Sequence, residues 1–240
     1  MKITVAYTAR NEADLILTTL TDAVRDMDAL GLSYEIIVVD NASTDQTAAL
    51  AEQFAATHTQ VRVIRHPSNL GYAHSNFTAY KNFTGDIVAV VDSDGQQVLR
   101  DMPKFLAKID AGADVVFGWR KQRNDPALRK IISFGLNVSA KQMLRWKLHD
   151  INCGFRVVTA EVARSFSDVV PVNYFGPELW VHSVQHNFVV DEVIVEHFER
   201  KGGVSIHIPW RMPATIKEAY KYLGLLQKRL PSSPNSVGQR

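Results

Sequence analysis

The chain has 240 residues, of which 46% are apolar and 22% carry a charge, and its formal net charge is +2. This length and balance are ordinary for a globular protein with one substantial core, and the small charge gives no reason to expect a nucleic-acid partner. Cys153 is the only cysteine, which excludes a disulfide within the chain and makes the reducing cytosol the expected compartment.

No segment is apolar over the length that a signal peptide or a membrane-spanning helix requires. Any contact with a membrane is therefore expected to be peripheral. No repeat or linker interrupts the chain, so residues 1–230 are expected to form one domain. Residues 231–240 have the composition of a disordered tail.

Short apolar runs alternate with helical patterns through the first half of the chain. Strands are predicted at 3–7, 35–40, 61–66, 87–91 and 114–118, and helices at about 12–30, 46–56, 73–83 and 103–111. Asn11 is the expected N-cap of the first helix and Gly31 its end. The alternation predicts right-handed crossovers and an α/β fold with a mostly parallel sheet.

The stretch 85–96 joins an apolar strand to a group of oxygen-bearing side chains. Asp92, Asp94 and Gln96 follow the strand at two-residue spacing, which in an extended segment places them on one side. Two carboxylates and an amide oxygen suit Mg²⁺ or Mn²⁺. The alternative is a polar turn in which Asp and Gly serve turn geometry, but the buried strand before it favours the metal site.

The second half is less regular. A basic stretch over 120–147 has apolar residues interleaved, and two interpretations stay open. One is a pair of helices packed on the sheet with solvated Lys and Arg, which the segment alone favours; the other is an amphipathic surface lying on an anionic membrane. Further on, the pattern predicts a loop entering a helix over 173–186, a strand over 188–197 and an amphipathic helix over 210–230.

Seven short motifs follow one another along the chain: TARNE at 8–12, IIVVDNASTDQT at 36–47, NLGYA at 69–73, DSDGQ at 92–96, GWR at 118–120, DINCGFR at 150–156 and RKGGVS at 200–205. Their order and spacing resemble those of the family-2 glycosyltransferases, and more narrowly those of the polyprenol-phosphate sugar synthases, typified by dolichol-phosphate mannose synthase. The resemblance implies a single α/β domain of the glycosyltransferase A type, with a mostly parallel central sheet flanked by helices. It also implies a nucleotide-sugar half over 1–118 and an acceptor half over 119–230.

The same resemblance implies a role for each matched residue. Contacts to the donor are expected from Thr8, Arg10, Glu12, Val38, Asp40, Asp92, Ser93, Asp94, Arg120 and Arg200. The Mg²⁺ or Mn²⁺ ion is expected at Asp92, Asp94 and Gln96. Contacts to the acceptor are expected from Arg129, Lys130, Asp150, Arg156 and Glu178, with Asp150 and Arg156 paired to each other. The expected catalytic residues are Asp94, Arg120 and Glu178.

Each of these residues also has an ordinary structural interpretation. Asp40 could cap a turn, and Arg120 and Arg200 taken singly could be surface residues, although within the matched motifs a phosphate clamp is favoured. Cys153 is expected to be a small packed side chain and not a nucleophile. Ile206 stands where the family often has lysine, and together with other departures this leaves the donor base and sugar open.

The reaction that the resemblance implies is an inverting transfer of a sugar from a nucleoside-diphosphate sugar, of the GDP-mannose or UDP-glucose type, to a polyprenyl phosphate. A phosphate monoester with a second pKa of about 6 is already mostly dianionic at neutral pH and can attack without a general base. Two alternatives stay open. One is a family-2 transferase that acts on a hydroxyl of a glycan or small molecule, for which Glu178 would matter more as a base; the other is a nucleotide-sugar-binding protein without turnover.

A lipid acceptor implies work at the cytoplasmic face of a membrane. The stretch 119–148 and the helix around 214–230 are the expected means of contact, with Phe134, Trp146, Tyr220 and Tyr222 at the interface. A small membrane protein is a further partner that the resemblance allows.

Overall fold

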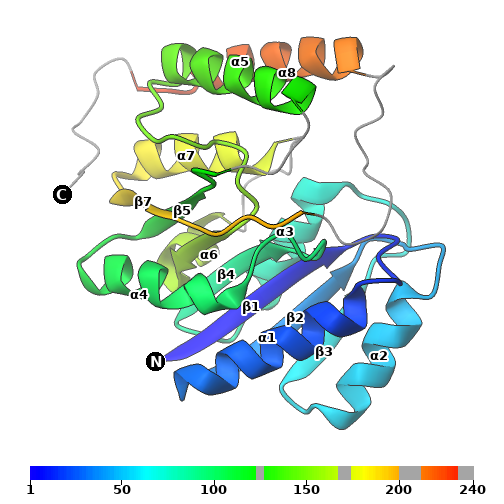
Figure 1. Ribbon diagram of the computed structural model, residues 1–240. Coiled ribbons are helices and arrows are strands. Elements are labelled where there is room, and N and C mark those ends of the chain that lie inside the picture. Colours follow the sequence, from blue (N-terminus) through cyan, green and yellow to red (C-terminus); the bar gives the residue numbers. More distant parts are fainter. Residues whose placement is uncertain (123–126, 167–173, 200–211, 232–240) are drawn as a thin grey trace.

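The computed structural model describes residues 1–122, 127–166, 174–199 and 212–231. Within them, seven strands form one sheet in the order β3-β2-β1-β4-β6-β5-β7 (Figure 1). The strands are β1 (Lys2–Ala9), β2 (Ser33–Asp40), β3 (Val61–Arg65), β4 (Ile87–Asp92), β5 (Val115–Trp119), β6 (Arg156–Thr159) and β7 (Val190–Ile194). The mostly parallel sheet is confirmed, since every pairing is parallel except the two that β6 makes with β4 and β5.

β6 was not expected from the sequence. It runs antiparallel between β4 and β5 and pairs Arg156 with both Val90 and Phe117. A strand of four residues is too short to give a periodic signal of its own, so its place is set by the two strands that flank it. Its antiparallel direction brings the DINCGFR segment, which precedes it, to the carboxyl end of β4.

The helices are α1 (Ile16–Leu30), α2 (Thr47–Thr57), α3 (Tyr72–Asn82), α4 (Met102–Asp110), α5 (Ala127–Met143), α6 (Ala160–Phe166), α7 (Phe175–His186) and α8 (Met212–Gln227), with the 3₁₀ turn η1 (Leu99–Asp101) before α4. Gly31 ends α1 as expected, with a positive φ of 64° and its N–H on the carbonyl of Asp28. Asn11 is not the N-cap, because α1 begins four residues later than the capped start would require. The basic stretch forms one helix, α5, and not a pair.

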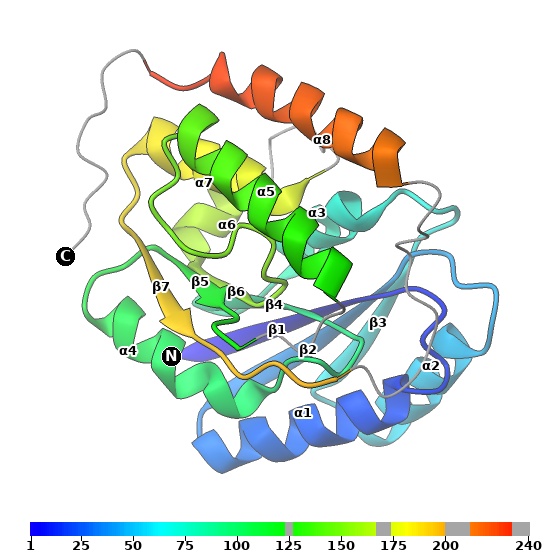
Figure 2. The ribbon, with the colours of Figure 1, turned by 45° about the horizontal axis from the view of Figure 1, so that its top comes forward.

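The sheet separates two apolar cores. On one face, α1, α2 and α4 cover alternate residues of the strands, including Val5, Val38 and Ala89. On the other face, α3, α6 and α7 cover the intervening residues, and α5 and α8 lie side by side as a further layer beyond α7 (Figures 1 and 2). The strict alternation follows from the two-residue period of side chains along a strand.

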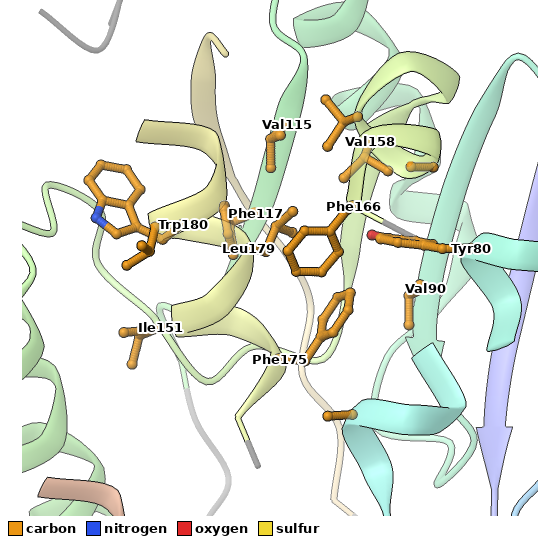
Figure 3. Packing of buried hydrophobic residues seen from close by; sticks show 14 of the residues in the cluster. Tyr80, Val90, Val115, Phe117, Ile151, Val158, Phe166, Phe175, Leu179 and Trp180 are labelled. Atoms are coloured by element: carbon orange, nitrogen blue, oxygen red, sulfur yellow. The ribbon is translucent and has the colours of Figure 1, made fainter. Parts of the chain in front are cut away.

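Aromatic rings fill the second core. Phe166 stacks on Phe77 at a centroid distance of 5.0 Å. Phe166 also meets Phe175 edge-on at 5.4 Å, and Tyr80 meets Phe175 at 5.4 Å. Figure 3 shows the rings of Tyr80, Phe166 and Phe175 close together. These contacts join α3, α6 and the start of α7 into one rigid layer beside β4. None of the helices in the described part of the chain is long and apolar enough to cross a membrane.

Candidate functional site

The carboxyl ends of β1, β2 and β4 meet at one edge of the sheet. Thr8 of β1 lies opposite Asp92 of β4, and Ala9 lies opposite Asp40 at the end of β2. The hydroxyl of Ser93 donates to the carbonyl of Thr8 at 2.9 Å, which ties the turn after β4 to β1. Parallel strands thus bring the first, second and fourth motifs together at the edge where open α/β sheets bind ligands.

Asp40 carries an oxygen that the surrounding protein does not satisfy. The side chain is 1% exposed, and Oδ2 accepts the N–H of Ser43 at 3.3 Å. Oδ1 is buried without a hydrogen-bond partner among the described residues. A buried carboxylate oxygen left in this state is costly unless a donor reaches it. Asp40 therefore supports its own turn, and the donor contact predicted for it stays a prediction.

Asp92 is the most closely held of the acidic residues at this edge. The hydroxyl of Tyr72, the first residue of α3, donates to Asp92 Oδ1 at 2.9 Å. On the other side, the carboxylate packs against the Cα of Gly154, where a Cβ would lie 1.9 Å from Asp92 Oδ2. The backbone thus approaches Asp92 closely at Gly154, and position 154 accommodates no side chain.

Asp94 and Gln96, the other two predicted metal ligands, lie in the turn that follows β4. Asp94 Oδ1 accepts the backbone N–H of Gln96 at 3.1 Å. The side-chain amide of Gln96 donates to the carbonyl of Phe198 at 3.1 Å, and Gln96 is 8% exposed. The described residues contain no group of three or more His, Cys, Asp or Glu arranged around one point. Two carboxylates with an amide nevertheless match the few protein oxygens that Mg²⁺ or Mn²⁺ takes when phosphates and water complete its shell.

Arg120 and Asp150 form the buried ion pair of the site. Arg120 Nε lies 2.7 Å from Asp150 Oδ2 and Nη2 lies 3.0 Å from Oδ1, and the two side chains are 7% and 4% exposed. Burial acts to lower the pKa of Arg120, but the adjacent Asp150 carboxylate outweighs it and the net shift is upward. The expected pairing of Asp150 with Arg156 is wrong, because Asp150 pairs with Arg120, which directly follows β5.

Arg156 lies instead in the aromatic layer beneath α3 and α7. It is 3% exposed, its Cζ lies 5.6 Å from the centroid of the Phe175 ring, and a Cβ on Gly176 would come within 3.1 Å of its Nη2. Its Nε and Nη1 are buried without hydrogen-bond partners in the described part of the structure. The acceptor contact predicted for Arg156 stays a prediction, and it would require an anionic group to reach a side chain that is almost wholly enclosed.

Glu178 is completely buried in α7. Tyr222 of α8 donates its hydroxyl to Glu178 Oε2, and Arg229 Nη1 lies 2.5 Å from Glu178 Oε1. Both oxygens therefore face residues of the C-terminal segment and not the carboxyl edge of the sheet. A role as general base stays a prediction that this arrangement does not favour, because a base must reach the proton that it removes.

The remaining predicted site residues differ in how far the structure describes them. Arg10 is exposed, and Glu12 is buried with its N–H on Thr47 Oγ1 at 2.8 Å. Val38 is 0% exposed within the core beneath α1, so its side chain does not reach the surface where a donor would bind. Arg200 lies outside the described residues. Arg129 and Lys130 belong to α5, but their side chains lie outside the described part.

Cys153 is a packed side chain, as expected. It is 0% exposed, and burial raises the pKa of its thiol to about 12. A thiol in that state is not available as a nucleophile at neutral pH. Gly118 lies against it, since a Cβ there would be 2.7 Å from Cys153 Sγ. The Cys153 side chain of the DINCGFR motif thus packs against β5 at Gly118.

The family model for Glycosyl transferase family 2 matches residues 4–166. The chain belongs to glycosyl transferase family 2. Two curated relatives of this family-2 chain carry polyprenyl-phosphate names. The dodecaprenyl-phosphate galacturonate synthase of Rhizobium johnstonii is 29% identical over 72% of this chain and 52% of its own length. The undecaprenyl-phosphate 4-deoxy-4-formamido-L-arabinose transferase of Shewanella sediminis is 26% identical over 85% and 61%. The family-2 chain thus spans little more than half the length of these relatives.

Solved structures share the fold of this family-2 chain. The glucosyl-3-phosphoglycerate synthase of Mycobacterium tuberculosis in complex with phosphoglyceric acid superimposes with a TM-score of 0.70 at 18% identity, over 97% of this chain and 81% of that one. The same enzyme with Mn²⁺, UDP-glucose and phosphoglyceric acid gives 0.67 at 18% identity, over 97% and 81%. At this identity the likeness supports the glycosyltransferase A-type fold and nothing narrower.

Proposed function

We propose that this chain transfers a sugar, with inversion, from a nucleoside-diphosphate sugar of the GDP-mannose or UDP-glucose type to a polyprenyl phosphate at the cytoplasmic face of a membrane. One observation supports the nucleotide-sugar donor. Asp40, Asp92 and Ser93 lie together at one edge of the sheet, and a buried Asp40 oxygen is available to a ligand. The names of the curated relatives support the acceptor half.

The donor would bind with its nucleoside over β1 and β2. Asp40 Oδ1 would accept from the ribose or the base, and the segment from Thr8 to Glu12 would border it. Asp92 and Ser93 would contact the nucleotide, and Arg200 would bind the diphosphate. Arg120 would also bind phosphate, because its pairing with Asp150 holds the guanidinium plane in one orientation.

Mg²⁺ or Mn²⁺ would be held by Asp92, Asp94 and Gln96. When bound there, the ion would stabilise the negative charge that develops on the leaving diphosphate. The chain's own contribution is the fixed arrangement of these oxygens, with Gln96 anchored to Phe198 and Asp94 to the turn.

The burial of Glu178 supports a phosphate acceptor over a hydroxyl. Both of its carboxylate oxygens lie against Tyr222 and Arg229, so the residue expected to act as a base is occupied. A polyprenyl phosphate needs no base, because its dianion attacks the anomeric carbon directly as the bond to the diphosphate breaks. Arg129 and Lys130 are the residues proposed to hold that phosphate, and Asp150 is proposed to shape the acceptor pocket through its pairing with Arg120.

The layer formed by α5 and α8 would rest on the membrane. Phe134 and Val138 of α5 and Tyr220 and Leu225 of α8 are exposed to 71%, 38%, 43% and 52%. The two helices are joined by a 2.7 Å hydrogen bond from Ser139 to the hydroxyl of Tyr220 and lie side by side at the outside of the molecule (Figure 2). Exposed cations lie on the same two helices and in the segment directly after α5: Lys141, Arg145, Lys147, Lys217 and Lys221.

Two of the aromatic residues expected at the membrane lie elsewhere. Trp146 is 2% exposed and Tyr222 is 8% exposed, and both pack in the core between α5, α7 and α8. Trp146 meets Trp180 at a centroid distance of 4.9 Å. They therefore hold the layer to the rest of the protein instead of entering lipid.

The test is transfer of a radiolabelled sugar from a panel of UDP and GDP sugars, with Mn²⁺ or Mg²⁺, into lipid extractable by organic solvent. We expect label in the lipid phase only when polyprenyl phosphate is present. Label in a water-soluble glycan or small molecule would replace the acceptor, and donor binding without any product would indicate a binding protein without turnover.

A further inference from the structure

The hydrogen bond between Tyr72 and Asp92 lies at the junction of two segments that the sequence keeps apart. Tyr72 opens α3 directly after Gly71, which has a φ of 90°, and its hydroxyl reaches Asp92 Oδ1 at 2.9 Å. Asp92 Oδ2 lies against Gly154, where any Cβ would overlap it. The carboxylate is thus held from two sides, by the Tyr72 hydroxyl and by the backbone at Gly154.

The guanidinium of Arg156 lies near Tyr72. Arg156 and Asp92 point to the same face of the sheet, because Arg156 pairs with Val90, two residues before Asp92. The guanidinium is 3% exposed and is enclosed by Phe175, Gly176 and the tyrosines of α3. A cation buried this deeply is retained only where an anion or its hydrogen-bond partner compensates for it.

We propose, on the basis of the proposed function, that Tyr72 and Arg156 are positioning residues for the donor side: the Tyr72 hydroxyl orients Asp92 toward the metal and diphosphate, and the buried Arg156 guanidinium lies on the same face of the sheet beside this pair. Arg156 then serves the donor and not the acceptor.

The effect on nucleotide binding should be measurable in the absence of an acceptor. Replacing partners that orient a metal ligand typically weakens metal binding about 10- to 100-fold. For Tyr72→Phe, which keeps the ring, we expect the Mn²⁺-dependent affinity for UDP or GDP, whichever the wild type binds, to fall about tenfold. Electron paramagnetic resonance of Mn²⁺ and calorimetric titration of the nucleotide measure this directly. Arg156→Lys should shift the same affinity in the same direction.

Tyr34→Phe is the matched control. Its hydroxyl also donates to an aspartate, Asp28 Oδ1 at 2.6 Å, but at the start of β2, the opposite end of the sheet. We expect its nucleotide affinity to equal that of the wild type. Thermal melting of all three variants checks that they are folded.

The outcomes separate the two proposals. Unchanged Mn²⁺-nucleotide affinity in a folded Tyr72→Phe protein would overturn this inference and leave the proposed function standing. If Arg156→Lys changed only the KM for the acceptor, the assignment of Arg156 to the donor side would be wrong. A wild-type protein that bound neither nucleotide with Mn²⁺ would overturn the proposed function and this inference with it.

Discussion

Arg120 and Asp150 stand 30 positions apart in the sequence, yet their side chains form two parallel hydrogen bonds, of 2.7 and 3.0 Å, in a part of the site closed to solvent. The pair joins the end of β5 to the segment that enters β6. It therefore both orients a guanidinium proposed to bind phosphate and fixes the loop that places Gly154 against Asp92.

Removing the acidic partner of this pair should destabilise the fold. In Asp150→Ala the Arg120 charge would stay buried without its carboxylate, and breaking a buried pair in this way costs about 3–5 kcal/mol. Urea unfolding followed by circular dichroism measures the change. Glu52→Ala is the control, since Glu52 meets Arg65 at 3.6 Å with both side chains about half exposed, and its unfolding midpoint should not move. Equal midpoints for the two variants would show that the buried pair adds nothing.

Asp94→Ala should abolish transfer without unfolding the protein. The side chain is partly exposed and contacts its own turn through the N–H of Gln96, so little packing is lost, whereas a proposed metal ligand is removed. We expect transfer to fall by about 100-fold or more, the size seen when one electrostatic contact to a developing charge is lost. Asp86→Ala, at the opposite end of β4, should keep wild-type activity. Full activity of Asp94→Ala in EDTA would rule out the metal assignment.

The face formed by α5 and α8 should bind anionic vesicles. Each Lys or Arg near anionic headgroups contributes about 1 kcal/mol, and that attraction fades within a Debye length, so binding should weaken from low to high salt. Phe134→Ser and Leu225→Ser should reduce co-sedimentation with liposomes several-fold by removing exposed apolar surface. Leu17→Ser, an equally simple change of a 40% exposed leucine on α1, should not. If all three variants sediment like the wild type, membrane contact lies elsewhere.

His182 should make the fold less stable in acid. Burial, then the charges of His186 and Arg229, lower the pKa of His182 to about 4, below its unfolded value of about 6.5. Between these values the unfolded chain binds a proton that the folded chain does not, so stability falls as the pH is lowered from about 6.5 to 4 and is unaffected above about 7. The shift corresponds to about 3 kcal/mol at pH 4.

The measurement is the free energy of unfolding in urea at several pH values for the wild type and His182→Gln. Glutamine can still face Ser165, which lies 3.0 Å from His182 Nε2, but it takes up no proton. The free energy of unfolding of the wild type should therefore fall relative to that of His182→Gln as the pH is lowered from about 6.5 to 4, because only the wild type loses stability through this group. Parallel curves would mean that His182 titrates alike in both states.

Much of the donor edge follows from the sequence alone. The runs Ile36–Val39 and Ile87–Val91 are apolar and rich in β-branched residues, which favours buried parallel strands, and Asp40 and Asp92 follow directly at their ends. Local pattern decides such elements, and parallel pairing then aligns their carboxyl ends. The side-chain chemistry of Cys153 likewise indicates packing and not catalysis, as the structure has it.

Only the tertiary structure decided which side chains meet. β6 inserts antiparallel between β4 and β5. This pairing of distant segments places Asp150 against Arg120 and Arg156 near Tyr72. The packing of α8 on α7 encloses Glu178, and that of α5 encloses Trp146, although each residue type suits an exposed site as well. A sequence motif specifies the chemistry that a side chain can perform. Its partner is set by the packing of segments far apart in the chain, where burial free energy and not local pattern selects the contact.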